Sequence, residues 1–174
     1  MKLLIVAHPD DEILWFNPED FDKIIIIFGF RPEIEEINIG RKRMMEVHPY
    51  RERIEFWNLV DTKHFIAGNI KRTIEKRLIS LAQMPYDTVF THNQIGEYGH
   101  MAHIFLHRLV TKVFQKRSIF VPSIFMENLD TCLQIKKRNL KEFNLIKELY
   151  QSHKCWTIND KFLPNCFLSF QKII

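Results

Sequence analysis

Short apolar, β-branched runs alternate along the chain with longer segments in which apolar residues recur every three or four positions. The short runs predict strands at Lys2–Ala7, Lys23–Phe28, Arg53–Asn58, Asp87–Thr91 and Ile119–Phe125. The longer segments predict helices at Glu33–His48, Asn69–Gln83, Gly99–Lys116 and Lys136–Tyr150. Such alternation is typical of βαβ units on a parallel sheet.

The run Ile24–Phe28 is apolar at consecutive positions, which indicates a strand that is buried on both faces. We therefore expect an α/β fold: Rossmann-like and doubly wound, with a mainly parallel sheet in the order 3-2-1-4-5 and helices on both faces. The first connection, between Asp11 and Asp22, allows only a short helix, and Pro18 is expected to start a new turn there. Residues 1–174 are expected to form a single domain.

Composition and charge set limits on the function. The chain has 174 residues, 46% of them apolar, and its net charge of +4 comes from 25 basic and 21 acidic residues. The densest basic runs, Arg41-Lys42-Arg43 and Lys136-Lys137-Arg138, are interpreted as solvated helix faces rather than a nucleic-acid footprint. We expect no nucleic-acid partner, although an anionic substrate remains open.

Cysteines and apolar runs favour a cytoplasmic protein. Cys132, Cys155 and Cys166 are odd in number and far apart, which predicts reduced thiols. The apolar run that begins at Leu3 is interrupted by His8, so it lacks the roughly 7–15 apolar residues of a secretory core. No apolar run reaches the roughly 20 residues of a transmembrane helix.

The most informative segment follows the first predicted strand. His8-Pro9-Asp10-Asp11-Glu12 places an imidazole and three carboxylates within five residues. Such groups must stay hydrated unless a cation or a substrate compensates their charge. The segment therefore predicts an ion site.

A second polar segment follows the fourth predicted strand. Thr91-His92-Asn93 ends that strand, and a loop with glycines at 96 and 99 leads to His100 and His103, which share a helix face because they are three apart. In a sheet of order 3-2-1-4-5, the first and fourth strands flank the crevice where ligands bind. The topology thus brings both segments to one site.

Together the two segments resemble the LmbE-like, or PIG-L, family of zinc-dependent de-N-acetylases. The resemblance rests on Ala7-His8-Pro9-Asp10-Asp11-Glu12 and Gly99-His100-x-x-His103, and extends to Gly96-Glu97-Tyr98 and Arg43-x-x-Glu46. It implies a hydrolase that removes the N-acetyl group from an N-acetylglucosamine-type sugar or sugar conjugate. The implied partner is thus a small acetylated sugar, and a homo-oligomer is left open.

The resemblance also implies roles for individual residues. His8, Asp11 and His103 would bind Zn²⁺ or another divalent transition metal, and zinc-activated water would attack the amide carbonyl. Asp10 would act as general base, and His100 would assist the oxyanion or the leaving group. Protonated His100 could be the oxyanion donor, and either Asp10 or His100 could protonate the departing amine.

Other residues near the motifs receive weaker roles. Arg43 resembles a substrate-binding arginine, with Arg41 or Lys42 as alternatives, and Glu12 is expected to support the site rather than bind metal. Trp15 and Tyr98 could form an apolar wall against a sugar ring. Three further histidines are expected to avoid the metal: His48 and His64 at the surface, and His92 along the loop.

One departure from the family pattern leaves alternatives open. Family members commonly carry Pro-Asp between the two histidines, where this chain has Met101-Ala102. A carboxylate that orients His103 is therefore expected to be missing, which would weaken zinc binding. A non-catalytic sugar-binding protein is one alternative, and a magnesium-dependent phosphoryl-transfer enzyme that uses Asp10, Asp11 and Glu12 is another.

Overall fold

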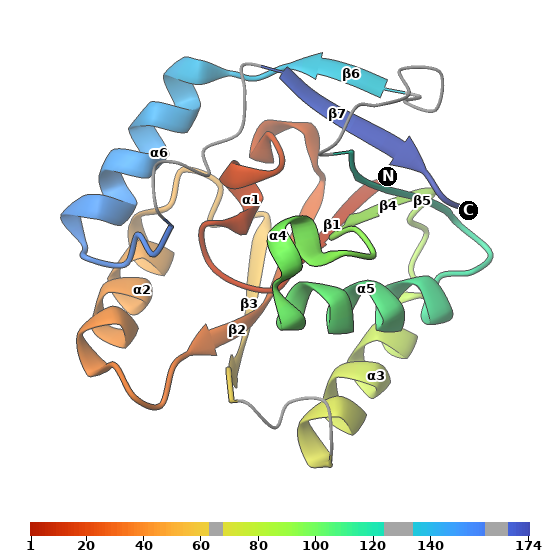
Figure 1. Ribbon diagram of the computed structural model, residues 1–174, viewed down its shortest axis with the longest axis horizontal. Helices are drawn as coiled ribbons and strands as arrows, with labels where there is room; N and C mark the ends of the chain where they lie inside the picture. Colours follow the sequence, from red (N-terminus) through yellow and green to blue (C-terminus); the bar gives the residue numbers. More distant parts are fainter. Residues whose placement is uncertain (63–67, 124–133, 159–166) are drawn as a thin grey trace.

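The computed structural model describes residues 1–62, 68–123, 134–158 and 167–174. Its centre is a sheet in the order β3-β2-β1-β4-β5-β7-β6 (Figure 1). The strands span Lys2–Val6 (β1), Lys23–Phe30 (β2), Ile54–Val60 (β3), Thr88–Thr91 (β4), Ser118–Pro122 (β5), Gln134–Lys137 (β6) and Phe167–Lys172 (β7). The first five are parallel and in the predicted order, which confirms the doubly wound α/β fold.

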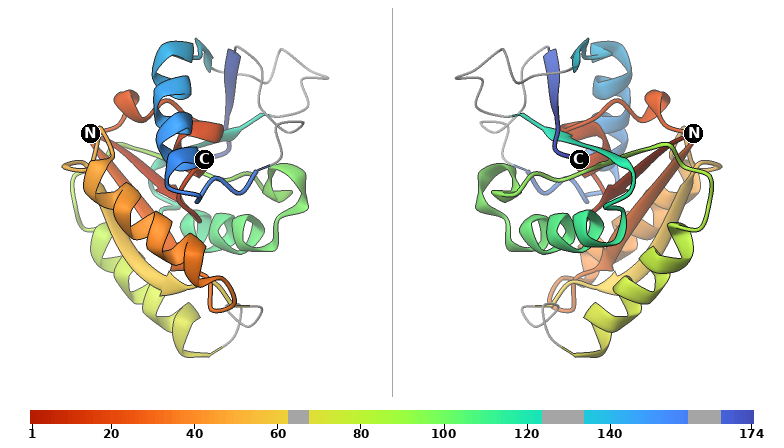
Figure 2. Two further views of the ribbon diagram at one scale, coloured as in Figure 1. Left: turned by 90° about the vertical axis from the view of Figure 1, so that its left-hand side faces the viewer. Right: turned by 90° about the vertical axis from the view of Figure 1, so that its right-hand side faces the viewer.

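Helices cover both faces of this sheet. They span Asp11–Leu14 (α1), Glu35–Val47 (α2), Asn69–Leu81 (α3), Gly96–Gly99 (α4), Met101–Val113 (α5) and Leu140–Ser152 (α6), and a 3-10 turn spans Pro18–Asp20 (η1). The turn begins at Pro18, as predicted. In the views of Figures 1 and 2, α6 and α3 lie on opposite sides of the molecule. No helix in the described ranges is long and apolar enough to cross a membrane.

Alternating residues of β1 pack into two hydrophobic cores, one on each face of the sheet. Leu3 and Ile5 pack with α3 and α5, which contribute buried residues such as Leu78 and Leu106. Leu4 and Val6 face the other side, where the core includes residues of the α1 segment. Burial on both faces is the reason that the central strands are continuously apolar.

The last part of the described chain differs from the prediction. Lys136 and Lys137 lie in β6, not in a helix, and α6 begins only at Leu140. β6 pairs antiparallel with β7, which in turn pairs antiparallel with β5. The sequence analysis did not predict β6 or β7, because these strands are short or mixed in polarity and their pairing partners are distant in sequence. Antiparallel strands at the edge of a parallel sheet are common in α/β proteins.

The expected solvent exposure of the two basic runs is wrong for Arg138 and Arg41. Both are buried rather than solvated. The guanidinium of Arg138 donates to the carbonyl oxygens of Ile13 and Leu14, which ties the start of α6 to the end of α1. Helix carbonyls at a C-terminus lack partners within the helix, so a cation is stabilising there.

Candidate metal centre

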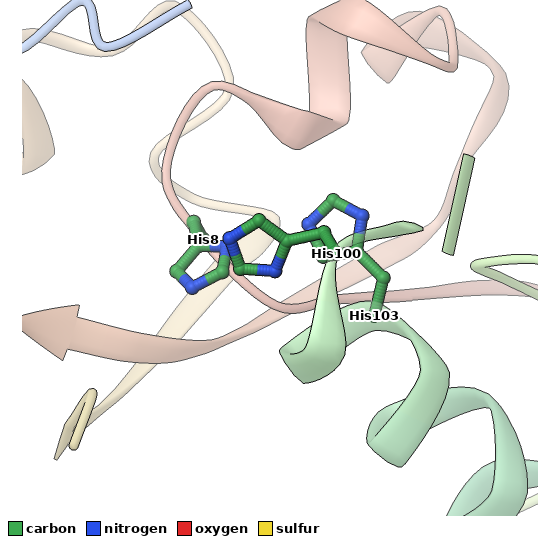
Figure 3. A group of neighbouring side chains, drawn as sticks. All are labelled: His8, His100 and His103. Atoms are coloured by element: carbon green, nitrogen blue, oxygen red, sulfur yellow. The ribbon is translucent and has the colours of Figure 1, made fainter. Parts of the chain in front are cut away.

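The predicted metal ligands come from two strand ends and meet at one point. His8 follows β1, Asp11 is the first residue of α1, and His103 lies in the first turn of α5. β1 is hydrogen-bonded to β2 on one side and to β4 on the other, so this is the position where the strand order reverses. Figure 3 shows the rings of His8, His100 and His103 gathered beyond the strand end. The topology therefore places them as expected.

Asp11 lies among three imidazoles. Its Oδ2 is 3.4 Å from Nδ1 of His8, 3.3 Å from Nε2 of His103 and 3.4 Å from Nε2 of His92. The backbone N–H of His8 also donates to this oxygen at 2.8 Å. Burial alone raises the pKa of the Asp11 carboxyl, but His103 and His92 outweigh it and hold the pKa well below its usual value. Asp11 is thus a buried carboxylate.

His103 offers a nitrogen to a cation. Its Nδ1–H donates to Oε2 of Glu97 at 2.6 Å, and its Nε2 forms no hydrogen bond within the described residues although it is buried. Leaving a buried polar nitrogen unpaired costs free energy unless another partner is present. The unpaired Nε2 beside the Asp11 carboxylate fits a divalent cation.

In His8, as in His103, one ring nitrogen contacts a supporting carboxylate and the other faces Asp11. Its Nε2 lies 3.0 Å from Oδ2 of Asp61, just after β3, and its Nδ1 faces Asp11. A carboxylate on one ring nitrogen directs the other nitrogen toward the metal, a pattern common among metal-binding histidines. Two imidazoles and one carboxylate form a donor set that zinc accepts.

The described residues contain two groups of potential metal ligands: His8, His100 and His103, and Asp11, His92 and His103. His92 thus belongs to the second group. Its Nε2, however, accepts a hydrogen bond from the backbone N–H of Ala7 at 3.0 Å. Its Nδ1–H donates to Oε2 of Glu97, also at 3.0 Å. Both ring nitrogens of His92 are thus engaged, which makes His8 the better third ligand. The ring of His92 stacks on that of His103, with centroids 3.7 Å apart, and so helps to position it.

Asp10 sits beside these ligands in a left-handed backbone conformation, with φ of 97°. Its Oδ2 accepts a hydrogen bond from Oγ1 of Thr157 at 3.0 Å. Burial, followed by repulsion from Asp11, raises the pKa of the Asp10 carboxyl to about 7. A carboxylate with a pKa near neutrality is suited to accept and return a proton.

His100 caps α5 and faces the same point. Its Nδ1 accepts the N–H of Ala102 at 3.3 Å, and its ring stacks on His103 with centroids 4.4 Å apart. Burial, followed by repulsion from His103 and His8, lowers its pKa to about 4. The lowered pKa favours a neutral His100 over the protonated ring considered from the sequence. Because Nδ1 accepts from Ala102, the neutral ring would carry its proton on Nε2.

Glu12 lies outside both groups of potential ligands in the described chain. Its Oε1 accepts from the hydroxyl of Tyr150 at 2.7 Å and faces Nε2 of His48 at 3.3 Å, while its Oε2 accepts from the N–H of Asp10. These bonds support the Asp10 turn, as expected. The predicted surface position of His48 is wrong, because His48 is buried against Glu12, and His64 lies outside the described residues.

The two arginines of α2 differ in position. Arg43 is exposed and lines a shallow hollow between α2 and the end of α6. Arg41 is buried, and its guanidinium donates to the carbonyl oxygens of Phe28 and Gly29. Its charge lowers the pKa of Asp10, against the larger effects of burial and Asp11. The role of Arg43 in substrate binding stays a prediction.

Trp15 and Tyr98 lie side by side, with ring centroids 6.2 Å apart. Trp15 is buried and Tyr98 is 45% exposed. The ring of Tyr98 also lies 5.8 Å from that of His100, so Tyr98 borders the site and Trp15 packs beside it.

Three contributors to the site were not recognised from the sequence. Glu97 and Asp61 contact ring nitrogens of His103 and His8, and Thr157 contacts Asp10. Glu97 falls within the second motif, so a carboxylate beside two histidines was an available signal. Asp61 directly follows β3, which extends two residues beyond the predicted strand, whereas Thr157 has no local pattern that identifies it.

Comparison with known proteins agrees with this fold. The sequence matches no protein-family model. Over 125 residues it is 27% identical to uncharacterized protein L374 of Acanthamoeba polyphaga mimivirus. That match covers 63% of this chain and 56% of the viral protein, so it spans little more than half of its relative.

Solved structures provide closer comparisons of shape. N,N'-diacetylchitobiose deacetylase from Pyrococcus horikoshii has a TM-score of 0.60 at 14% identity, covering 99% of this chain and 83% of that one. The A40926 pseudoaglycone deacetylase Dbv21 has a TM-score of 0.55 at 14% identity, covering 88% and 81%. The 4-carboxy-2-hydroxymuconate hydratase GalB from Pseudomonas putida has a TM-score of 0.54 at 11% identity, covering 99% and 96%.

These similarities confirm the resemblance to LmbE-like de-N-acetylases at the level of the fold. A hydratase also shares it, so the fold by itself does not specify the reaction. The reaction has to be argued from the site.

Proposed function

We propose that this protein is a metal-dependent hydrolase that removes the N-acetyl group from an N-acetylglucosamine-type sugar or sugar conjugate. The observation that carries the proposal is the approach of His8 Nδ1 and His103 Nε2 to one carboxylate oxygen of Asp11, next to Asp10. This arrangement combines a metal-binding donor set with a buried carboxyl of raised pKa. Fold neighbours that act as deacetylases support the same reaction class.

His8 Nδ1, Asp11 Oδ2 and His103 Nε2 would hold zinc or another divalent transition metal. When bound there, the cation supplies a Lewis acid and makes water a nucleophile near neutral pH. Three protein donors leave a coordination position open, as is typical of catalytic rather than structural zinc sites.

Asp10 would take the proton from the attacking water. Thr157 orients its carboxylate, and burial keeps its proton affinity high enough for this task. His100 would donate its Nε2–H to the carbonyl oxygen as negative charge develops there. The amine then leaves only after protonation, and Asp10 and His100 are the two groups available to supply that proton.

Substrate recognition would use residues around the mouth of the site. Tyr98 would pack against the sugar ring, because its ring borders His100, and the buried Trp15 would support Tyr98 from behind. Arg43 would contact a more distant part of the sugar conjugate from its exposed position on α2. A larger conjugate therefore fits this assignment better than the free monosaccharide.

The phosphoryl-transfer alternative requires Glu12 to share a cation with Asp10 and Asp11. Both carboxylate oxygens of Glu12 instead contact protein groups, namely the N–H of Asp10, the ring of His48 and the hydroxyl of Tyr150. The histidines would also have no role in that reaction. The geometry therefore favours amide hydrolysis.

Acetate release provides the test. The purified chain, loaded with zinc, is incubated with free, nucleotide-linked and lipid-linked N-acetylhexosamines, and acetate is measured by an enzyme-coupled assay. We expect release from at least one class and loss of release after chelation. Tight binding without turnover across the panel would instead support a non-catalytic sugar-binding protein.

A further inference from the structure

Glu97 is the common acceptor of two buried imidazoles. Its Oε2 accepts Nδ1–H of His103 at 2.6 Å and Nδ1–H of His92 at 3.0 Å. Its Oε1 accepts the backbone N–H of Asn93 at 2.9 Å. All three donors face one carboxylate that is only 2% exposed.

The backbone around Glu97 is shaped for these contacts. Glu97 has φ of 58° and ψ of −63°, a combination that costs a non-glycine residue free energy. Asn93 holds it there, because the Asn93 Oδ1 accepts the N–H of Glu97 at 2.9 Å. Gly96 precedes it with φ of 67°, and a Cβ at this position would lie 2.9 Å from a side-chain carbon of Ile104. A strained residue that is fixed from several sides is typical of functional loops.

We infer that Glu97 is a positioning residue that fixes the tautomer of His103 for metal binding. With Nδ1 protonated and bound to Glu97, the lone pair of His103 resides on Nε2, beside Asp11. The same carboxylate holds His92 so that its Nε2 accepts the N–H of Ala7 and its ring supports His103. This inference rests on the proposed function, because it concerns the same metal centre.

Glu97 also provides the carboxylate that orients His103, in place of an acidic residue between His100 and His103. Neither Met101 nor Ala102 carries a carboxylate that could accept the Nδ1–H of a histidine, and Ala102 is completely buried. The carboxylate that orients the ligand comes instead from the loop that precedes the two histidines. The expectation that no such carboxylate is present is therefore wrong.

The first test reads the tautomers directly. Burial lowers the pKa values of His92 and His103, but Glu97 and Asp11 outweigh it, raising that of His92 to about 9 and also raising that of His103. Long-range ¹H–¹⁵N correlation spectra of the metal-free chain are therefore recorded at alkaline pH, where both rings are neutral and the spectra distinguish protonated Nδ1 from protonated Nε2. We expect Nδ1–H in His103 and His92 of the wild type, and a shift toward Nε2–H in E97Q. In D61N only the His8 signals should change. Protonated Nε2 on His103 of the wild type would overturn the inference without any variant.

The second test measures zinc affinity by competition with a chromophoric chelator. E97Q should bind zinc roughly 10–100-fold more weakly than wild type, as is usual when a partner of a metal-binding histidine is lost. E97D, which keeps the charge but shortens the side chain, should lie between them. The matched control is E55Q. Glu55 lies on β3, and its carboxylate contacts the side chains of Lys23 and Trp57. Equal affinities of E97Q and E55Q would overturn the inference.

The two tests also separate this inference from the proposed function. If wild type and E97Q bind zinc equally and both release acetate, Glu97 does not position the ligand but the hydrolase proposal stands. If the tautomers shift in E97Q but no form of the chain releases acetate, the hydrolase proposal fails and the role of Glu97 stands.

Discussion

Nε2 of His103 lies 3.3 Å from Oδ2 of Asp11, although the two residues follow different strands. The contact exists because β1 and β4 are adjacent and parallel, so the segments after them share one edge of the sheet. A cation between these atoms would compensate the buried carboxylate and satisfy the unpaired nitrogen together.

Asp11→Asn tests this relationship. An amide oxygen carries no charge, so zinc affinity should fall by more than the roughly 10–100-fold expected for a residue outside the ligand set. Isothermal titration calorimetry measures the change, with E55Q as the control. Affinity within about tenfold of wild type would remove Asp11 from the ligand set.

The sequence predicted the parts of the fold that depend on local pattern. The five parallel strands and their order follow from consecutive apolar runs separated by helical periods. His8, Asp11 and His103 are the ligands that the resemblance carried by two short motifs implies, and their binding of metal stays a prediction. Lys136 and Arg138 were misplaced, because a basic run has no periodicity that separates a strand from a helix start. Side-chain partners such as Asp61 and Thr157 could not be predicted, because their contacts depend on how distant segments pack.

Arg43→Ala tests the proposed contact with substrate. Arg43 is exposed, so its loss should change the free energy of unfolding by no more than about 0.5 kcal/mol. If Arg43 binds substrate, KM should rise several-fold while kcat stays near the wild-type value. Lys42→Ala, at the exposed neighbouring position, is the control. An unchanged KM in both variants would contradict the assignment.

Gly40→Ala should destabilise the protein although alanine favours helices. A Cβ on Gly40 would lie 2.0 Å from the carbonyl oxygen of His153, so α2 would have to move away from the end of α6. Such overpacking costs about 1–3 kcal/mol. Urea unfolding measures the loss, with the exposed Ile39→Ala as the control. Equal stability of the two variants would show that this contact is looser than described.

Tyr150→Phe should weaken the support of the Asp10 turn. The hydroxyl of Tyr150 donates to Glu12, whose other carboxylate oxygen accepts the N–H of Asp10. Removing a buried hydrogen bond to a carboxylate costs about 1.5–3 kcal/mol. Chemical denaturation should detect this loss, and stability equal to wild type would mean that Glu12 finds another partner.

Asp10→Asn tests the central claim most directly. Zinc content and acetate release are measured together for wild type and variant, with the acetylated sugar that wild type hydrolyses fastest. Because Asp10 would move the proton but not bind the metal, the variant should keep its zinc and lose roughly 10²–10⁴-fold in kcat. Acetate release at the wild-type rate by the zinc-loaded variant would contradict the proposed mechanism.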